Sequence, residues 1–264
     1  MNTGEKGELL VKMKLTQMRD EHAIFNGETI VSVGYFKEYK SPSKIISGTL
    51  LLDSEKAEKE LITLCGEMNI EKASTYNKSD VYINHKGYSL KSTYGANSAL
   101  VNHTNRTGFE RVCIEVGADI NKLDSIIEEY WQLRETGILT EDVRNDNPLS
   151  PFKDHKGFFK PILEYFLFTG SGSRRSKYPA EFILEFSDSL NAENWEIIGK
   201  DEAIDRLWPK LVFSMRSKKG MPKNYTLNYC GKNATSIAKW VRVRDNECKG
   251  ALHIRVAENQ KHRI

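Results

Sequence analysis

Residues 80–92 constrain the fold of this chain more than any other stretch, because their pattern predicts a tight β-hairpin. Val81 and Ile83 belong to a first strand-like run, residues 88–92 form a second, and Asn84-His85-Lys86-Gly87 separates them. Turn-forming residues between two short runs of this kind are typical of a hairpin. This part of the chain is therefore expected to belong to a β-sheet.

Side-chain alternation brings three polar residues of the hairpin to one place. Ser89 and Lys91 are two positions apart, so both point to the same face of their strand. Asp80 begins the partner strand, and the register of a short hairpin brings its carboxylate near them. A carboxylate that holds Mg²⁺ beside a lysine that orients or deprotonates a water suits metal-assisted phosphodiester hydrolysis. Because such pairs are also common on plain protein surfaces, other motifs must support this interpretation.

Helical and strand-like patterns alternate along the rest of the first half. The apolar spacing over residues 3–21 predicts a helix, with Leu9, Leu10, Met13 and Met18 near one side. Asn26-Gly27 lies between apolar runs and predicts a second hairpin turn. Asp53-Ser54 can cap a further helix, whose apolar stripe is Ala57, Leu61, Leu64, Cys65 and Met68. Residues 109–116 are predicted to form a strand, and residues 120–131 a helix.

A soft boundary is expected at residues 137–157, where Asn, Asp, Pro and Ser favour loops. We therefore predict an N-terminal part over 1–136 and a C-terminal part over 137–264, packed together as one unit. The C-terminal part should contain an apolar helix at residues 158–168, a loop at 170–176, a strand at 182–186 and a short helix at 203–208. Further strand-like segments should follow in the basic region. Helices that alternate with strand pairs predict an α/β fold with a central mixed β-sheet flanked by helices.

The positive charge of the chain is concentrated near its C-terminal end. The formal net charge is only +3, but ten basic and two acidic residues lie between Ser214 and Val256. A local excess of this kind suits a polyanion, although a solvated basic face has the same composition. We therefore expect the C-terminal part to form a basic recognition half.

Three segments are the candidates for contact with nucleic acid. Arg174 and Arg175 belong to a Gly/Ser-rich loop that lacks the ending of a nucleotide-binding P-loop. Arg216, Lys218 and Lys219 form a second basic loop, and Arg242 and Arg244 share one face of an alternating strand. We expect that face to point to phosphate and Val241 and Val243 to point to the core. Trp240 is more typical of a core residue than of a base-stacking one.

The sequence gives no sign of export or of membrane insertion. The N-terminus has no apolar segment, and no apolar run is long enough to span a bilayer. The four cysteines lie far apart, as expected for reduced thiols. A cytoplasmic protein without membrane contact is therefore expected.

The hairpin and its surroundings resemble a known nuclease superfamily. Asp80, followed by Ser89 and Lys91 in the spacing Asp-x(8)-Ser-x-Lys, is similar to the PD-(D/E)XK core. The stretch SLKSTYGANSALVNHTNRTGF at residues 89–109 resembles a signature of type II restriction endonucleases similar to HpaII-type enzymes. Asn-Thr-Gly-Glu-Lys-Gly-Glu at residues 2–8 resembles the helix start of the same enzymes. The resemblance covers about the first 115 residues.

Two residues depart from the superfamily pattern. Ser79 replaces a proline that is not a metal ligand, and Ser89 replaces the acidic residue of the (D/E)xK triplet. Another carboxylate should compensate, and Glu8 is the first candidate, ahead of Glu5 in the same helix. Glu110 and Glu115 in the following strand-like segment are the other candidates. The resemblance also implies the Leu90 carbonyl as a metal ligand and a water-mediated contact for Ser89.

The resemblance implies Mg²⁺-dependent, sequence-specific hydrolysis of double-stranded DNA with 5′-phosphate and 3′-hydroxyl products. Asp80 would bind Mg²⁺, Glu8 would complete or orient the metal shell, and Lys91 would act on the water. It further implies a homodimer, and a cognate DNA methyltransferase that acts on the same site without necessarily contacting this chain. Residues 1–136 would be the nuclease core and 137–264 the recognition region. Two alternatives stay open: a structure-selective repair nuclease, and a DNA-binding protein whose nuclease core has decayed.

Overall fold

The computed structural model describes residues 1–44, 46–74, 76–93, 99–217, 239–244 and 247–257. The chain divides into a first unit, Met1–Ala96 with Ser176–Lys200, and a second unit, Asn97–Arg175 with Asp201–Ile264. This division differs from the boundary expected at residue 137. The reason is that strands from residues 182–199 complete the sheet of the first unit, a pairing that local composition does not reveal.

The first unit is built on a five-stranded mixed sheet, as expected for an α/β fold. Its strands lie in the order β3-β4-β5-β7-β8. Neighbouring strands are antiparallel except for β5 and β7, which are parallel. The bounds are β3 Val33–Gly34, β4 Val81–Ile83, β5 Lys86–Ser92, β7 Phe182–Phe186 and β8 Trp195–Gly199, with the short 3₁₀ helix η4 at Ala192–Asn194.

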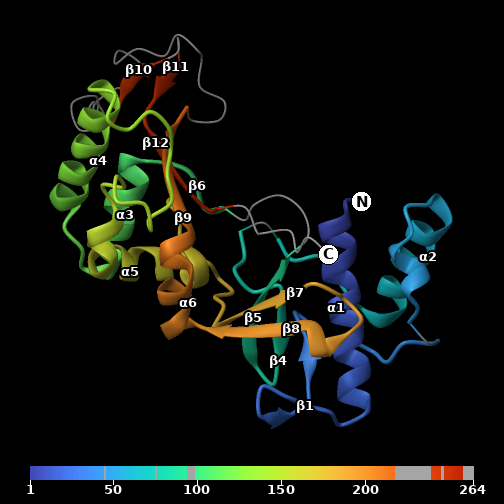
Figure 1. The fold of residues 1–264 in the computed structure, drawn as a ribbon. Coiled ribbons are helices and arrows are strands. Elements are labelled where there is room, and N and C mark those ends of the chain that lie inside the picture. The colour runs from blue at the N-terminus through green and yellow to red at the C-terminus, as the bar shows by residue number, and fades with distance from the viewer. Residues whose placement is uncertain (45, 75, 94–98, 218–238, 245–246, 258–264) are drawn as a thin grey trace. The chain divides into compact units, whose positions relative to one another are not determined.

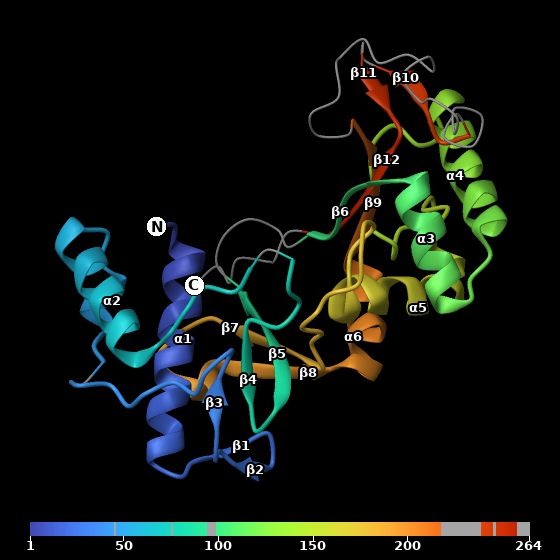
Figure 2. The same cartoon turned by 180° about the vertical axis from the view of Figure 1, so that it is seen from behind.

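Two helices accompany this sheet, and Figures 1 and 2 show α1 between the sheet and α2. Helix α1 spans Thr3–Asp20 and begins at a capping box formed by Asn2 and Glu5. Helix α2 spans Glu55–Met68 and is capped by the Ser54 side chain, so both sequence predictions are confirmed. The hairpin predicted at residues 26–27 is also present, between β1 Ile24–Phe25 and β2 Glu28–Thr29. The 3₁₀ helix η1 lies at Gly48–Leu51.

The hairpin predicted over residues 80–92 is formed by β4 and β5. Its turn is tighter than expected, because only Asn84 and His85 lie outside the strands, with φ of 48° and 67°. The Asn84 side chain accepts hydrogen bonds from the backbone N–H groups of Val31 and Ser32 at 2.8 and 3.2 Å. A residue that tolerates positive φ therefore also ties the hairpin to the preceding segment.

The second unit has its own sheet, in the order β6-β12-β9, and a separate β10-β11 hairpin. Figure 1 shows α3, α4 and α5 on one side of the three-stranded sheet, and their apolar residues form one core with it. The helices are α3 Arg106–Val116, α4 Ile120–Glu135, η2 Lys153–His155, α5 Lys156–Glu164, the π-helical η3 Tyr165–Thr169, α6 Lys200–Leu207 and η5 Trp208–Lys210. The strands are β6 Ala99–Asn105, β9 Leu211–Arg216, β10 Arg242–Arg244, β11 Glu247–Lys249 and β12 Ala251–Val256.

The strand prediction for residues 109–116 is wrong, because this segment belongs to helix α3. The side chain of Asn105 caps the helix by accepting from the N–H of Gly108, and Gly117 ends it with φ of 70°. Phe109, Val112 and Cys113 recur at helical spacing and are buried. Burial of this helically spaced stripe decides in favour of a helix over the predicted strand.

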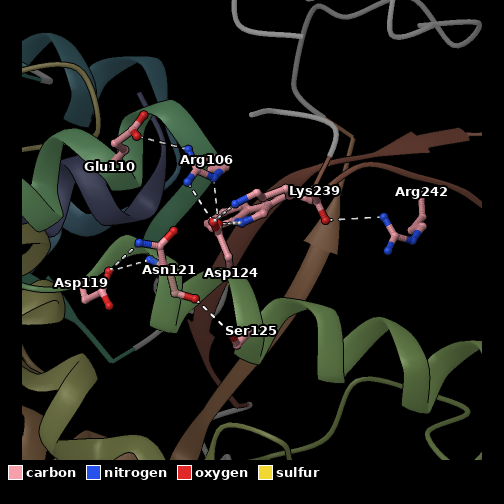
Figure 3. Close-up of polar contacts among 9 residues, drawn as sticks. Arg106, Glu110, Asp119, Asn121, Asp124, Ser125, Lys239 and Arg242 are labelled. Carbon is pink, nitrogen blue, oxygen red and sulfur yellow. Dashed lines mark hydrogen bonds and ion pairs between the residues drawn. The ribbon is translucent and has the colours of Figure 1, made fainter. Parts of the chain in front are cut away.

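Figure 3 shows an ion-pair network of the second unit in which Arg106 and Lys239 contact Asp124. The Asp124 carboxylate accepts from Arg106 at 2.7 and 2.8 Å, from Trp240 Nε1 at 2.8 Å and from Lys239 Nζ at 3.1 Å. Trp240 is fully buried, so the core interpretation is confirmed. Burial raises the pKa of Asp124, but the hydrogen bonds from Arg106, Trp240 and Lys239 outweigh it and hold the pKa below its ordinary value.

Replacement of Asp124 by alanine is expected to destabilise the protein by about 3–5 kcal/mol, because it leaves the Arg106 guanidinium buried without its counter-charge. Urea unfolding of Asp124→Ala measures the loss. Asp205→Ala is the matched control, since Asp205 pairs with Lys156 and Lys160 on the surface and its removal should change little. Equal stability of the two variants would contradict a role for Asp124 in stability.

Within the described part of the chain, no helix is both long enough and apolar enough to cross a membrane.

Candidate active site

Asp80 lies immediately before strand β4 in the first unit, with its carboxylate held against β5. Its backbone N–H donates to the Tyr88 carbonyl at 2.8 Å. Its Oδ2 atom accepts from the Leu90 N–H at 2.8 Å and from the Ser89 hydroxyl at 3.3 Å. The hairpin therefore brings Asp80 and Ser89 together, as the sequence predicted, and sets the backbone of Leu90 beside them.

The environment of Asp80 opposes its ionisation. Burial raises the pKa of this carboxyl, Lys91 lowers it and Glu8 raises it, and the net result is a pKa above the ordinary value. Charged residues from two other places in the chain are thus close enough to act on Asp80. A half-buried carboxylate within the electrostatic range of a second carboxylate is an arrangement that a cation relieves.

Lys91 lies two residues beyond Ser89 on β5, and both point away from Tyr88 and Leu90, which belong to the core of the unit. Its register partner on the parallel strand β7 is Glu185. The positive charge of Lys91 acts on Asp80 and also on Lys78. Lys91 therefore shares one face of the hairpin with Ser89, within electrostatic range of Asp80.

Glu8 projects from helix α1, and of the two helix glutamates it is the one that acts on Asp80. It forms an ion pair at 2.9 Å with Lys12, whose side chain is fully buried. The runner-up, Glu5, is used elsewhere: it accepts from the N–H of Asn2 in the capping box and pairs with Lys72. The preference for Glu8 over Glu5 agrees with these contacts.

Glu110 and Glu115 lie in helix α3 of the second unit, not on a strand that continues the hairpin. Glu110 pairs with Arg106 at 3.3 Å, and Glu115 pairs with Arg111 at 3.1 Å. Because the strand on which their candidacy depended is a helix, they do not stand beside Asp80 along a common sheet.

Ser79 shows why this chain has no proline before Asp80. Its backbone N–H donates to the Tyr178 carbonyl at 3.0 Å, a bond that proline cannot make. Its hydroxyl donates to the Pro179 carbonyl at 2.5 Å. Gly87 lies so close that an added Cβ would stand 2.2 Å from the Ser79 hydroxyl. These contacts fix the start of β4, and with it the position of Asp80.

Several residues near Asp80 were missed by sequence reasoning. Lys12 is fully buried, and its ammonium donates to Glu8 and, at 3.1 Å, to the Glu71 carbonyl. Burial and Lys91 lower the pKa of Lys78 to about 8, against the effect of Asp80. Tyr39 is buried, and its hydroxyl has no hydrogen-bond partner among the described residues. A lysine among the apolar residues of a helix was the one available signal, since a buried lysine requires a counter-charge.

The donors around Asp80 fit a hard divalent cation in kind. Asp80, Glu8, Ser89 and the Leu90 backbone offer only oxygen ligands, which Mg²⁺ prefers. The hydrogen bonds that Ser89 and the Leu90 N–H donate to the Asp80 carboxylate both go to its Oδ2 atom. In the described ranges no group of three or more His, Cys, Asp or Glu side chains is arranged to hold a metal. Carboxylates thus supply at most part of a coordination shell here, and backbone or water oxygens would supply the rest.

The Gly/Ser/Arg loop is held in place by Arg111 of helix α3. Arg111 donates to the carbonyls of Ser171 and Gly172 and to the Tyr165 hydroxyl. Arg174 and Arg175 project from this loop and are exposed, and Arg175 lies 3.9 Å from Glu115. An anchored loop that exposes two arginines remains suited to contact with phosphate.

The second and third basic segments differ from one another. Arg216 is exposed, and its guanidinium donates to Asp142 at 3.3 Å. Lys218 and Lys219 lie outside the described residues. Arg242 pairs with Glu128 and Glu135 of helix α4 at 2.7 and 3.3 Å.

The expectation about the two faces of the strand at residues 242–244 is wrong. Val243 is 77% exposed, whereas Arg242 is bound to helix α4 and Arg244 donates to the Arg134 carbonyl at 2.9 Å. The arginine side of β10 therefore lies against the protein and the valine side faces solvent. The side chains still alternate, but the bonds that Arg242 and Arg244 make with α4 turn the arginine face of this short strand inward.

In comparisons with known proteins, no protein-family model, no curated protein and no solved structure matches this chain.

Proposed function

We propose that this chain is a Mg²⁺-dependent endonuclease that hydrolyses double-stranded DNA at specific sequences, as type II restriction endonucleases of the PD-(D/E)XK superfamily do. One observation carries the proposal: the half-buried carboxylate of Asp80 is held by Ser89 and by the N–H of Leu90, within the electrostatic influence of Lys91 and of Glu8. The order of these residues along the chain, helix glutamate first and hairpin pair second, supports it. This order is the one that the motif resemblance implies.

Each residue has a role in the proposed reaction. Asp80 and Glu8, with the Leu90 carbonyl, would hold the cation, and Ser89 orients the Asp80 carboxylate through its hydroxyl. A bound Mg²⁺ polarises a phosphoryl oxygen and lowers the pKa of a water ligand. Lys91 orients the attacking water and offsets negative charge that develops on the phosphoryl group. The water adds to phosphorus, the bond to the 3′ oxygen breaks, and a 5′-phosphate and a 3′-hydroxyl result.

The second unit would bind the DNA. Arg174 and Arg175 are the best-supported phosphate contacts, because their loop is anchored and their side chains are exposed. Arg242 instead forms an ion pair with helix α4, and Arg244 donates a hydrogen bond to it. A homodimer would cut both strands of a palindromic site. The enzyme would work in the cytoplasm, where a methyltransferase of the same specificity would protect the DNA of the cell.

Digestion of several sequenced plasmids tests the proposed function. With Mg²⁺ we expect discrete fragments whose ends share one sequence, and with a chelator we expect none. Cleavage restricted to branched or damaged DNA would favour the repair nuclease instead. Salt-sensitive binding without any cleavage would favour the decayed core.

Replacement of Lys91 by methionine is expected to slow cleavage by about a hundredfold or more, the effect of losing a general acid–base group. DNA binding, measured by fluorescence anisotropy, should change little. Lys86→Met is the matched control on the same strand, because Lys86 pairs with the surface residue Glu28 at 2.7 Å. Unchanged cleavage by Lys91→Met would remove Lys91 from the reaction.

A further inference from the structure

Tyr39 is a buried tyrosine whose backbone is held by two hydrogen bonds. It is 2% exposed and belongs to the core of the first unit. Its N–H donates to the Val33 carbonyl at 2.8 Å, and its carbonyl accepts from Arg19 at 2.6 Å. The ring is therefore fixed in the core, and the hydroxyl cannot turn to solvent without disrupting it.

The hydroxyl of Tyr39 makes no hydrogen bond with any described residue. Two other buried tyrosines have paired hydroxyls: that of Tyr88 accepts from Asn26 at 3.2 Å, and that of Tyr130 donates to Asp142 at 2.8 Å. A buried hydroxyl without a partner costs folding free energy, and phenylalanine would fill nearly the same space without that cost. Stability of the isolated fold therefore does not account for a tyrosine here.

The surroundings of this hydroxyl indicate what it faces. Glu8, Glu71 and Asp80 are all close enough to act on the phenol electrostatically. Burial raises the pKa of Tyr39 first of all, and these negative charges raise it further. The buried hydroxyl therefore keeps its proton and is available as a donor, within electrostatic range of the two carboxylates of the candidate cation site.

We propose that Tyr39 is a positioning residue of this site, whose hydroxyl donates a hydrogen bond to a water of a hydrated divalent cation held by Glu8 and Asp80. The inference rests on the metal-binding part of the proposed function. Oxygens that bind a metal are commonly oriented by hydrogen bonds from neighbouring residues, and loss of such a neighbour weakens metal binding. The Tyr39 hydroxyl would thus lower the stability of the metal-free protein and raise its affinity for the divalent cation.

Tyr39→Phe tests this with two readouts on the full-length protein, neither of which needs cleavage. Without metal, its melting temperature should equal or exceed that of the wild type, because an unpaired buried hydroxyl is removed. Its affinity for Mn²⁺ alone, measured by calorimetry, should fall by about tenfold. Tyr130→Phe is the matched control: the loss of its bond to Asp142 should lower the melting temperature and leave Mn²⁺ affinity unchanged.

The outcomes separate this inference from the proposed function. If Asp80→Asn abolishes Mn²⁺ binding while Tyr39→Phe binds as the wild type does, the cation site stands and the role of Tyr39 is overturned. If Asp80→Asn binds Mn²⁺ as tightly as the wild type, or the wild type binds none, the cation site itself fails and Tyr39 fails with it. A lower melting temperature for Tyr39→Phe, with unchanged affinity, would assign the hydroxyl to the fold.

Discussion

Replacement of Asp80 by asparagine is expected to abolish DNA cleavage and, at the same time, to stabilise the metal-free protein. Cleavage should fall by roughly a thousandfold or more, because a metal ion contributes several kcal/mol to the stabilisation of the transition state. The fold should survive, since the asparagine oxygen can still accept the N–H of Leu90. DNA binding should be retained, because the exposed arginines lie in the second unit.

The gain in stability follows from the raised pKa of Asp80. A carboxyl whose pKa is higher in the folded state than in the unfolded state binds its proton more tightly when folded. Its contribution to stability is therefore lost as the pH rises through the folded pKa. Asparagine carries no charge, so the melting temperature should rise by about 2–4 °C for each 1 kcal/mol gained, and the gain should shrink as the pH is lowered.

Calorimetric scans over a pH series measure this gain, and a plasmid digest measures the loss of cleavage. Asp188→Asn is the matched control, because Asp188 also accepts a backbone N–H in the first unit, that of Leu190 at 2.9 Å, but is exposed. That variant should cleave and melt like the wild type. Full cleavage by Asp80→Asn would remove Asp80 from the active site.

Replacement of Glu8 by glutamine should have two separate effects. It leaves the fully buried ammonium of Lys12 without its counter-charge, which is expected to cost about 3 kcal/mol of stability. It also removes the second carboxylate of the proposed cation site, so cleavage should fall strongly. Because an unstable protein also cleaves poorly, this single variant does not separate the two effects.

The double variant Glu8→Gln/Lys12→Met separates them. Removal of both charges of a buried pair is often nearly neutral, so urea unfolding should show stability close to that of the wild type. Cleavage should stay low. The control is Glu55→Gln, which breaks an ion pair of the same helical spacing with Lys59 on an exposed surface and should affect neither property. A double variant that cleaves as the wild type does would exclude Glu8 as a metal ligand.

The structure is compatible with a serine, in place of the acidic residue of the superfamily pattern, at position 89. Ser89 is 5% exposed and donates to Asp80, whereas an acid at this position would set a third negative charge beside Asp80 and Glu8. The serine is therefore compatible with a site that takes its second carboxylate from helix α1. The present geometry favours Glu8 for this role over Glu5, which is committed to the capping box and to Lys72.

The sequence by itself determined the parts of this protein that depend on local physics. Turn residues and side-chain alternation determine the β4–β5 hairpin, and with it the common face of Asp80, Ser89 and Lys91. The caps at Asn2 and Ser54 begin α1 and α2 where the sequence predicted. These features follow from hydrogen bonds and sterics within a few residues, so they can be read without the fold.

Only the tertiary structure decided which distant segments meet. The parallel pairing of β5 with β7 sets Glu185 beside Lys91 across about a third of the chain, and no local pattern specifies that register. The burial of Lys12 and Tyr39 depends on how helix α1 packs in the first unit. In the second unit, Arg242 lies against helix α4 because it forms ion pairs with two glutamates of that helix. Register and packing are settled by the total surface that the fold buries, which is a property of the whole chain and not of any one segment.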